Sequence, residues 1–347
     1  MNKEATNTSE PVNFFSKKYL IISMSLSFLT MAGVIWYTYT PGVLTYLVPK
    51  RLPGLGIALV VSFLRVWFGA AKIRFLSEKV ITWMGAFRVV LAWDFTSAVT
   101  PSTIGGAPMA TYAMTKEGLK LGESTAIVLY GVLLDQIWFA LAIPILLIAG
   151  LKYDVVPPDI GMIGEVSMII LYVSLLSYAA LLAYGVLINP AAIKKVIKII
   201  FKLPFLRKYQ DKISVEAEHL EGYAHQLRKK PFSFLAKAFF LSTMSWLCRV
   251  ALATIVVLSL LPAPEILSVL RSLAMNLAFL VVPTPGGSGG VEGLFVLFQG
   301  SLISRKSFIG LAVFLWRIIS YYISIALGMF ATTWYINRSV LEKQKKD

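Results

Sequence analysis

The sequence predicts an all-α polytopic membrane protein with six full spans and two re-entrant helical hairpins in an inverted-topology repeat. Three observations predict this fold class. First, 57% of the residues are hydrophobic and the mean hydropathy is +0.73, whereas soluble domains contain roughly 45–50% apolar residues. Second, two similar Pro-Gly motifs interrupt apolar segments. Third, the basic residues are distributed unevenly over the connecting loops, as in membrane proteins of fixed orientation.

Long uncharged runs predict the spans. Residues 19–49 and 166–193 contain no Asp, Glu, Lys or Arg, and about 20 apolar residues suffice to cross a hydrocarbon core of about 30 Å. The run after residue 18 is too long for a signal peptide, so we interpret it as an uncleaved first span. The predicted spans are 19–40, 54–72, 122–150, 164–188, 233–261 and 308–337.

Two further apolar segments are interrupted near their centres. Segments 83–115 and 266–304 are long enough to enter the membrane and return, but their central Pro and Gly residues oppose a continuous helix. We therefore expect each of them to form a re-entrant hairpin.

The basic residues set the orientation. With a cytoplasmic N-terminus, the inside segments hold 22 Lys or Arg residues and the outside loops hold five. This bias predicts a multi-pass protein of the cell membrane with both termini in the cytoplasm. It requires the first hairpin to open to the cytoplasm and the second to the outside. The inside segments are 1–18, 72–79, 116–120, 189–231 and 338–347.

This orientation divides the chain into a tail (1–18), a first membrane half (19–188), a basic cytoplasmic loop (189–231), a second membrane half (232–337) and a tail (338–347). The formal charge of +15 predicts contact with anionic lipid rather than nucleic acid, because the basic residues flank apolar spans. The loop carries an apolar helical stripe of Leu220, Tyr223, Ala224 and Leu227. We expect a solvated or membrane-surface helix there; a specific lipid or regulator site is the alternative.

The residues with metal or thiol chemistry predict neither a cofactor nor a metal site. Cys248 is the single cysteine and lies in an apolar run, where packing is its usual role. His219 and His225 lie in the basic loop without a cysteine partner. No Gly-x-x-x-x-Gly-Lys-Ser/Thr loop is present, so direct coupling to ATP is not expected.

The two interruptions repeat one motif. Residues 99–108 (VTPSTIGGAP) and 283–292 (PTPGGSGGVE) both contain Thr-Pro-x-x-x-Gly-Gly. Each motif is followed by a span with a charge inside it. Asp135 follows Pro101 by 34 residues, and Arg317 follows Pro285 by 32. Similar motifs that open to opposite sides are typical of an inverted-topology repeat.

The motifs predict an anion site near the middle of the membrane. Irregular backbone at this depth must be buried in protein or line a wet cavity, and helix N-termini that start after glycine pairs present free N–H groups to an anion. The alternative is that the glycines only permit tight packing of each hairpin. The candidate glycines are Gly105, Gly106, Gly286, Gly287, Gly289 and Gly290.

Charged residues inside apolar segments are the other candidates, because each needs a partner or water. Glu292 and Arg317 accompany the second motif, where they bind substrate or form a structural ion pair. Arg271 and Asn276 lie five residues apart before the second motif, so we expect them to line one cavity. Further possible coupling or structural charges are Arg88, Asp94, Asp135 and Arg249. For Arg65 the alternatives are snorkelling to the interface, pairing with an acidic residue, or contact with substrate.

The second motif also carries a family resemblance. Residues 284–292 (TPGGSGGVE) and 315–322 (LWRIISYY) resemble the lysylphosphatidylglycerol synthase transmembrane region, a flippase-like family, and the likeness extends from about residue 15 to 338. The resemblance implies a lipid-translocation module in which Glu292 and Arg317 match the motif residues of the second half. The first half departs from the family pattern at Asp135-Gln136, where the family tends to have an acidic residue followed by Arg, and at Ala107 and Met109.

Together these features predict a flippase-like transporter that moves an anionic phospholipid or a lipid-linked phosphate between leaflets, with no enzymatic activity. The headgroup phosphate is expected between the hairpin tips, and Asp135 or Glu292 is a candidate for proton coupling. We do not expect the aminoacyl-transferase activity of the synthase, because residues 1–347 contain no counterpart of its aminoacyl-transferase domain. An intramembrane enzyme acting on lipid headgroups and a non-transporting membrane partner subunit are the alternatives. The oligomeric state is not predicted.

Overall fold

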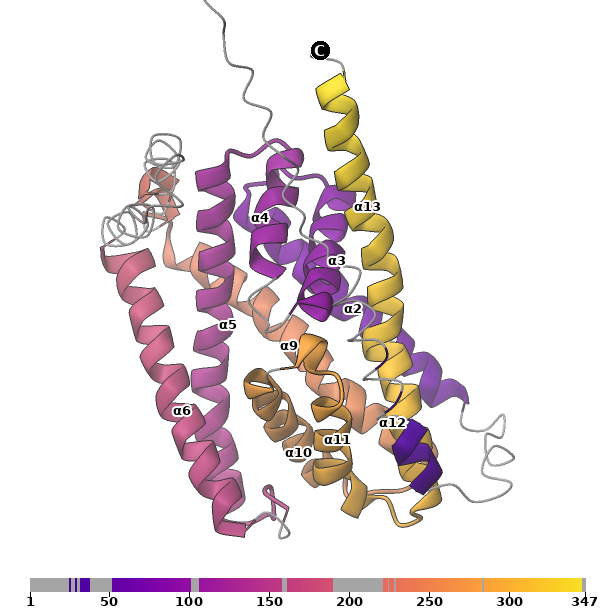
Figure 1. The fold of residues 1–347 in the computed structure, drawn as a ribbon. Coiled ribbons are helices and arrows are strands. Elements are labelled where there is room, and N and C mark those ends of the chain that lie inside the picture. The colour runs from indigo at the N-terminus through magenta and orange to yellow at the C-terminus, as the bar shows by residue number, and fades with distance from the viewer. Residues whose placement is uncertain are drawn as a thin grey trace, which may run out of the picture.

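The computed structural model describes residues 52–100, 106–157, 161–189, 221–223, 225–227, 229–282 and 284–344, together with residues 25, 29 and 32–37. Over these residues the protein is helical and contains no strand, which confirms the all-α class (Figure 1). The long helices are α2 (Leu52–Leu76), α3 (Trp83–Val99), α4 (Gly106–Lys116), α5 (Leu121–Gly150), α6 (Gly161–Ala183), α9 (Phe232–Leu260), α10 (Glu265–Ala278), α11 (Gly290–Gln299), α12 (Ser307–Arg317) and α13 (Ile323–Gln344).

Four helices in the described part of the chain are long and apolar enough to cross a membrane. They are Leu52–Leu76, Leu121–Gly150, Phe232–Leu260 and the continuous run Ser307–Arg338. They coincide with four of the six predicted spans. The predicted span 164–188 corresponds to α6 and the π-helix Tyr184–Ile188 that follows it, and α6 lies along α5. Most of the predicted span 19–40 lies outside the described residues.

The two interrupted segments form two helix pairs. In Figure 1, α3 and α4 lie in the upper half of the molecule, whereas α10 and α11 lie in the lower half. The first pair is closely packed because Gly106 starts α4 without a side chain, where a Cβ atom would collide with Trp93 and Ser97 of α3. Thr82 caps α3, since its hydroxyl accepts a hydrogen bond from the Gly85 amide (3.1 Å). Residues 101–105, at the tip of this pair, lie outside the described residues.

A buried polar network holds the second pair to α9. The Gln299 side chain of α11 donates to the Ser268 carbonyl and to the Ser272 hydroxyl of α10, each at 2.9 Å. The Thr254 hydroxyl of α9 lies 2.9 Å from that of Ser272. Because every one of these side chains is buried, the network fixes one arrangement of the three helices.

Two large hydrophobic cores correspond to the two pairs. One core joins α10, α11 and α12 to α5 and α9, and the other joins α3 and α4 to α2, α5 and α13. Between them lies a small cluster of Phe95, Ala98, Val99 and Ile325, with Tyr321 packed against it. The end of α3 therefore meets the π-helix between α12 and α13 at the junction of the two halves.

Part of the basic loop docks on the first core. Leu227 is buried there, and the Tyr223 hydroxyl donates a 2.7 Å hydrogen bond to the Leu76 carbonyl at the end of α2. Burial, followed by the charges of Glu78 and Glu123, raises the pKa of Tyr223 above its usual value. Two members of the predicted stripe thus contact the protein itself; Leu220 and Ala224 lie outside the described residues.

Candidate functional site: a charged cavity at membrane depth

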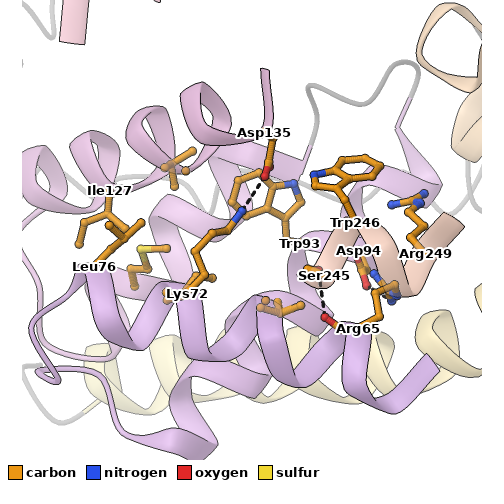
Figure 2. A pocket seen from close by; sticks show the side chains of 16 residues that line it. Arg65, Lys72, Leu76, Trp93, Asp94, Ile127, Asp135, Ser245, Trp246 and Arg249 are labelled. Carbon is orange, nitrogen blue, oxygen red and sulfur yellow. Dashed lines mark hydrogen bonds and ion pairs between the residues drawn. The ribbon is translucent and has the colours of Figure 1, made fainter. Parts of the chain in front are cut away.

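A cavity of about 170 Å³ lies between α2, α3, α5 and α9 (Figure 2). Apolar side chains, among them Leu76 and Ile127, line one end. Arg65, Asp94 and Arg249 lie at the other end. A cavity with this many ionisable side chains is wet or holds a ligand, because an isolated charge in an apolar interior is very costly.

The cavity reaches the middle of the predicted span. Arg65 precedes Leu76, the last residue of α2, by eleven positions, which is ~16 Å along a helix. This is about half of the roughly 30 Å hydrocarbon thickness. With α2 as the predicted span 54–72, we expect the charged end of the cavity near the midplane, and the apolar end toward the side on which α2 terminates.

The cavity lining contains two ion pairs. Arg65 Nη2 lies 2.6 Å from Asp94 Oδ2 and also donates to the Ser324 hydroxyl at 3.1 Å. Lys72 Nζ lies 2.9 Å from Asp135 Oδ1, and the Ser242 hydroxyl donates to the same carboxylate oxygen. Each carboxylate of the cavity is thus neutralised by one cation from α2.

Arg249 is different, because it has no ion pair or hydrogen bond with any residue that the structure describes. Its guanidinium lies over two aromatic rings, 5.3 Å from the ring centre of Trp246 and 5.4 Å from that of Phe279. Cation–π contacts hold the group without neutralising it. The described lining therefore contains three cations and two carboxylates, which leaves an excess of one positive charge.

The second hairpin tip has a different arrangement. Gly286, Gly287 and Gly289 have φ values of 60°, 68° and 85°, a region that favours glycine. Glu292 folds back over this turn and caps α11, since one carboxylate oxygen accepts from the Gly289 amide at 2.8 Å. Its other oxygen accepts from Arg317 Nε at 2.7 Å.

The Glu292–Arg317 pair is almost completely buried, with 0% and 1% of each residue exposed. The Arg317 guanidinium also lies over the ring of Tyr321, 3.9 Å from its centre. A carboxylate of the protein thus occupies the helix N-terminus at which the sequence predicts a substrate anion. Neither residue lines the cavity.

The other tip glycines provide close contacts. A Cβ atom on Gly286 would lie 2.7 Å from the Ala98 carbonyl oxygen and would also collide with the Tyr321 hydroxyl. The tip of the second pair therefore packs against the end of α3. A Cβ atom on Gly287 would meet Phe279, and one on Gly290 would meet Val282. Gly105 lies outside the described residues.

Arg271 and Asn276 form hydrogen bonds within the protein. Arg271 donates to the carbonyls of Asp154 and Phe298 and to the Ser301 hydroxyl, at the opposite end of the second pair from its tip. Asn276 donates to the Ser272 carbonyl of its own helix at 2.8 Å. They do not line the described cavity.

Arg88 does not line the cavity. It pairs with Glu117 at 3.5 Å, and its guanidinium lies 3.9 Å from the ring centre of Trp334. The Tyr335 hydroxyl donates to the same Glu117 carboxylate at 2.9 Å. These contacts join α13 to the first helix pair. Asp94, Asp135 and Arg249, by contrast, all line the cavity, so the structure brings these three predicted charges together.

Sequence reasoning missed several cavity residues. Lys72 counts among the cytoplasmic basic residues in the sequence, yet only 14% of its side chain is exposed and it pairs with Asp135. A signal was present, because Asp135 lies deep in an apolar span and requires a cation. Trp93, Trp246 and Ser245 also line the cavity and carry no such signal, since aromatic and hydroxyl side chains are common in membrane helices.

Comparison with known proteins identifies the family of the chain. The family model for the lysylphosphatidylglycerol synthase TM region matches residues 20–328. The chain belongs to this family. It is also 24% identical over 329 residues to a UPF0104 membrane protein of Archaeoglobus fulgidus, an alignment that covers 89% of this chain and 95% of the relative. The family and the apolar helices together establish an integral membrane protein.

Proposed function

We propose that this protein transports an anionic phospholipid or a lipid-linked phosphate between the two leaflets, without changing it covalently. The observation that carries the proposal is the cavity between α2, α3, α5 and α9, which combines membrane depth with one excess positive charge. At an effective dielectric constant of about 20, two unit charges 4 Å apart attract each other by about 4 kcal/mol. Electrostatic attraction therefore stabilises an anionic headgroup in this cavity but not a neutral one.

The arrangement of the helix pairs supports alternating access. We propose that α3/α4 and α10/α11 are the re-entrant hairpins of an inverted-topology repeat with six full spans. The two pairs lie in opposite halves of the molecule (Figure 1) and meet where Gly286 contacts Ala98. In such repeats the substrate site lies at the interface of the halves, near the midplane. The charged end of the cavity lies at this depth.

A headgroup-modifying enzyme remains the competing reading of the family name, and the chemistry of the cavity favours transport. The carboxylates of the cavity, Asp94 and Asp135, are each held by a cation. No cluster of three or more His, Cys, Asp or Glu residues occurs in the described part of the chain. Cys248 does not line the cavity. We therefore propose that the ion pairs organise a binding site rather than a reaction centre.

Reconstitution into liposomes tests the proposal. Fluorescently labelled phosphatidylglycerol is placed in both leaflets, and a membrane-impermeant reductant measures the fraction that reaches the outer leaflet over time. We expect the protein to accelerate exchange while mass spectrometry of the extracted lipid shows an unchanged headgroup. Exchange no faster than in protein-free vesicles would contradict transport, and a modified headgroup would establish the enzyme.

A further inference from the structure

We propose that the cavity selects for a headgroup that carries a single negative charge, and that Arg249 is the residue that binds this charge. The inference rests on the proposed function and narrows its substrate class to lipids with one phosphodiester and an otherwise neutral headgroup. Zwitterionic lipids and lipids with a phosphate monoester or a pyrophosphate fall outside this class.

The charge count leaves one cation for the ligand. Asp94 and Asp135 are engaged by Arg65 and Lys72 at 2.6 and 2.9 Å. Arg249 lines the cavity and forms no ion pair within 4 Å with a carboxylate of the described residues, and Asp94 and Asp135 act on it only at longer range. A ligand with one negative charge makes the loaded cavity neutral. A neutral ligand leaves the excess charge in place, and a doubly charged ligand replaces it with an excess of the opposite sign, so both are disfavoured at membrane depth.

The position of Arg249 suits an oxygen ligand of this kind. Its guanidinium has five N–H donors, and none donates to a described residue; planar donors of this type bind phosphate through two parallel hydrogen bonds. Trp246 and Phe279 hold the group at the charged end of the cavity (Figure 2). Arg65 lies at the same end of the cavity, which increases the attraction for an anion without changing the charge count.

The lipid chains need a separate path, and the opposite end of the cavity provides apolar lining. Leu76 and Ile127 line this end (Figure 2). A headgroup bound at Arg249 therefore has polar surroundings at its phosphate and apolar side chains toward the end of α2. This distribution distinguishes a lipid from a free anion, which gains nothing from the apolar end.

Binding of short-chain lipids to the purified full chain in detergent tests the charge class separately from transport. Isothermal titration calorimetry compares dihexanoyl phosphatidylglycerol, phosphatidylcholine and phosphatidic acid at pH 8, where a phosphate monoester carries close to two charges. We expect phosphatidylglycerol to bind about tenfold more tightly than either of the others, the size of one charge-assisted hydrogen bond. Equal affinities for the three lipids would overturn the inference.

Variants locate the selectivity. Arg249→Gln should lower the affinity for phosphatidylglycerol about tenfold and leave phosphatidylcholine unchanged, whereas Arg249→Lys should keep most of the preference. Asp135→Asn raises the charge of the cavity by one and should shift the preference toward phosphatidic acid. Lys152→Gln removes an exposed cation outside the cavity and is the matched control, expected to change nothing. Equal effects of Arg249→Gln and Lys152→Gln would overturn the assignment, with melting temperatures confirming that each variant is folded.

Free inorganic phosphate and glycerol 3-phosphate are the final arm of the test. We expect each of them to compete only weakly with the lipid. Competition with the same affinity as the lipid would mean that the ligand of the cavity is a soluble anion and not a lipid. Transport without charge selectivity contradicts this inference and leaves the proposed function intact. Selective binding without leaflet exchange contradicts the proposed function and leaves the inference intact.

Discussion

At the scale of single residues, the second motif places a carboxylate of the protein itself at the helix N-terminus where an anion is expected. Glu292 accepts hydrogen bonds from the Gly289 amide and from Arg317, and both residues of the pair are buried. The sequence places a carboxylate and a guanidinium 25 residues apart on neighbouring segments but does not reveal that they face each other. Of the two roles predicted for Arg317, the geometry favours the structural ion pair.

Removal of one partner should therefore cost more than removal of both. Arg317→Gln or Glu292→Gln alone leaves a buried charge unpaired, and we expect a loss of about 3–5 kcal/mol in unfolding free energy. The double variant Arg317→Gln/Glu292→Gln should recover much of this loss. The measurement is the apparent melting temperature and the chemical unfolding of each purified variant in detergent. A double variant as unstable as the sum of the two single variants would contradict the structural pair.

The cavity residues mark the limit of prediction at this scale. Charges inside an apolar sequence are easily recognised, and Arg65, Asp94, Asp135 and Arg249 are predicted in that way. Their pairing is not predicted, since the ion pairs Arg65–Asp94 and Lys72–Asp135 join positions far apart in the chain. Pairing depends on how the helices pack, and the hydropathy pattern contains no information on the rotation of one span about its own axis.

At the scale of elements, glycine determines how closely the helix pairs approach their neighbours. Hydropathy and Pro-Gly content predict the interrupted segments, and the structure resolves each into two short helices. The function of an individual glycine could not be predicted, because the sequence does not show which of them has a neighbour. Gly286 faces Ala98 and Tyr321, whereas nothing lies within 4 Å of a Cβ atom on Gly293 of the same pair.

Alanine substitutions at these two glycines should have opposite effects. Gly286→Ala places a Cβ atom 2.7 Å from a backbone oxygen at a positive φ, and the left-handed conformation alone costs about 1–2 kcal/mol. We expect a clear loss of thermal stability and of lipid exchange. Gly293→Ala lies in a helix with open space around it and should stabilise the protein by about 0.5–1 kcal/mol. Equal stability of the two variants would mean that the tip does not pack on α3.

At the scale of the whole molecule, the protein consists of two halves that each have a core and a helix pair. The sequence predicts this division through the repeated motif and the distribution of basic residues. It cannot predict the contact between the halves, which is made by the Gly286 turn, the end of α3 and Tyr321. That contact depends on tertiary packing of residues that show no periodic pattern of their own.

Opposite orientation of the two helix pairs is testable by labelling. Lys120→Cys lies in the connection that follows α4, and Ser304→Cys lies in the one that follows α11; both positions are exposed. In a Cys248→Ser background, a membrane-impermeant maleimide added to intact cells should label position 304 and not position 120. Inverted vesicles should give the reverse pattern. Labelling of both positions from one side would eliminate the inverted-topology repeat.

The π-helix Ile318–Tyr322 sets the phase of the last long helix. A π turn contains one residue more than an α turn and frees backbone groups. Here the Ile319 carbonyl accepts from the Ser62 hydroxyl of α2 at 2.8 Å. Each α-helical residue rotates the chain by about 100°, so deletion of one residue from this turn would rotate all of α13 by that angle relative to α12. Ser324 would then leave Arg65, and Gly328 would no longer face the Leu91 carbonyl of α3. The extra residue therefore lets one continuous helix present Arg317 to the second half and Gly328 to the first.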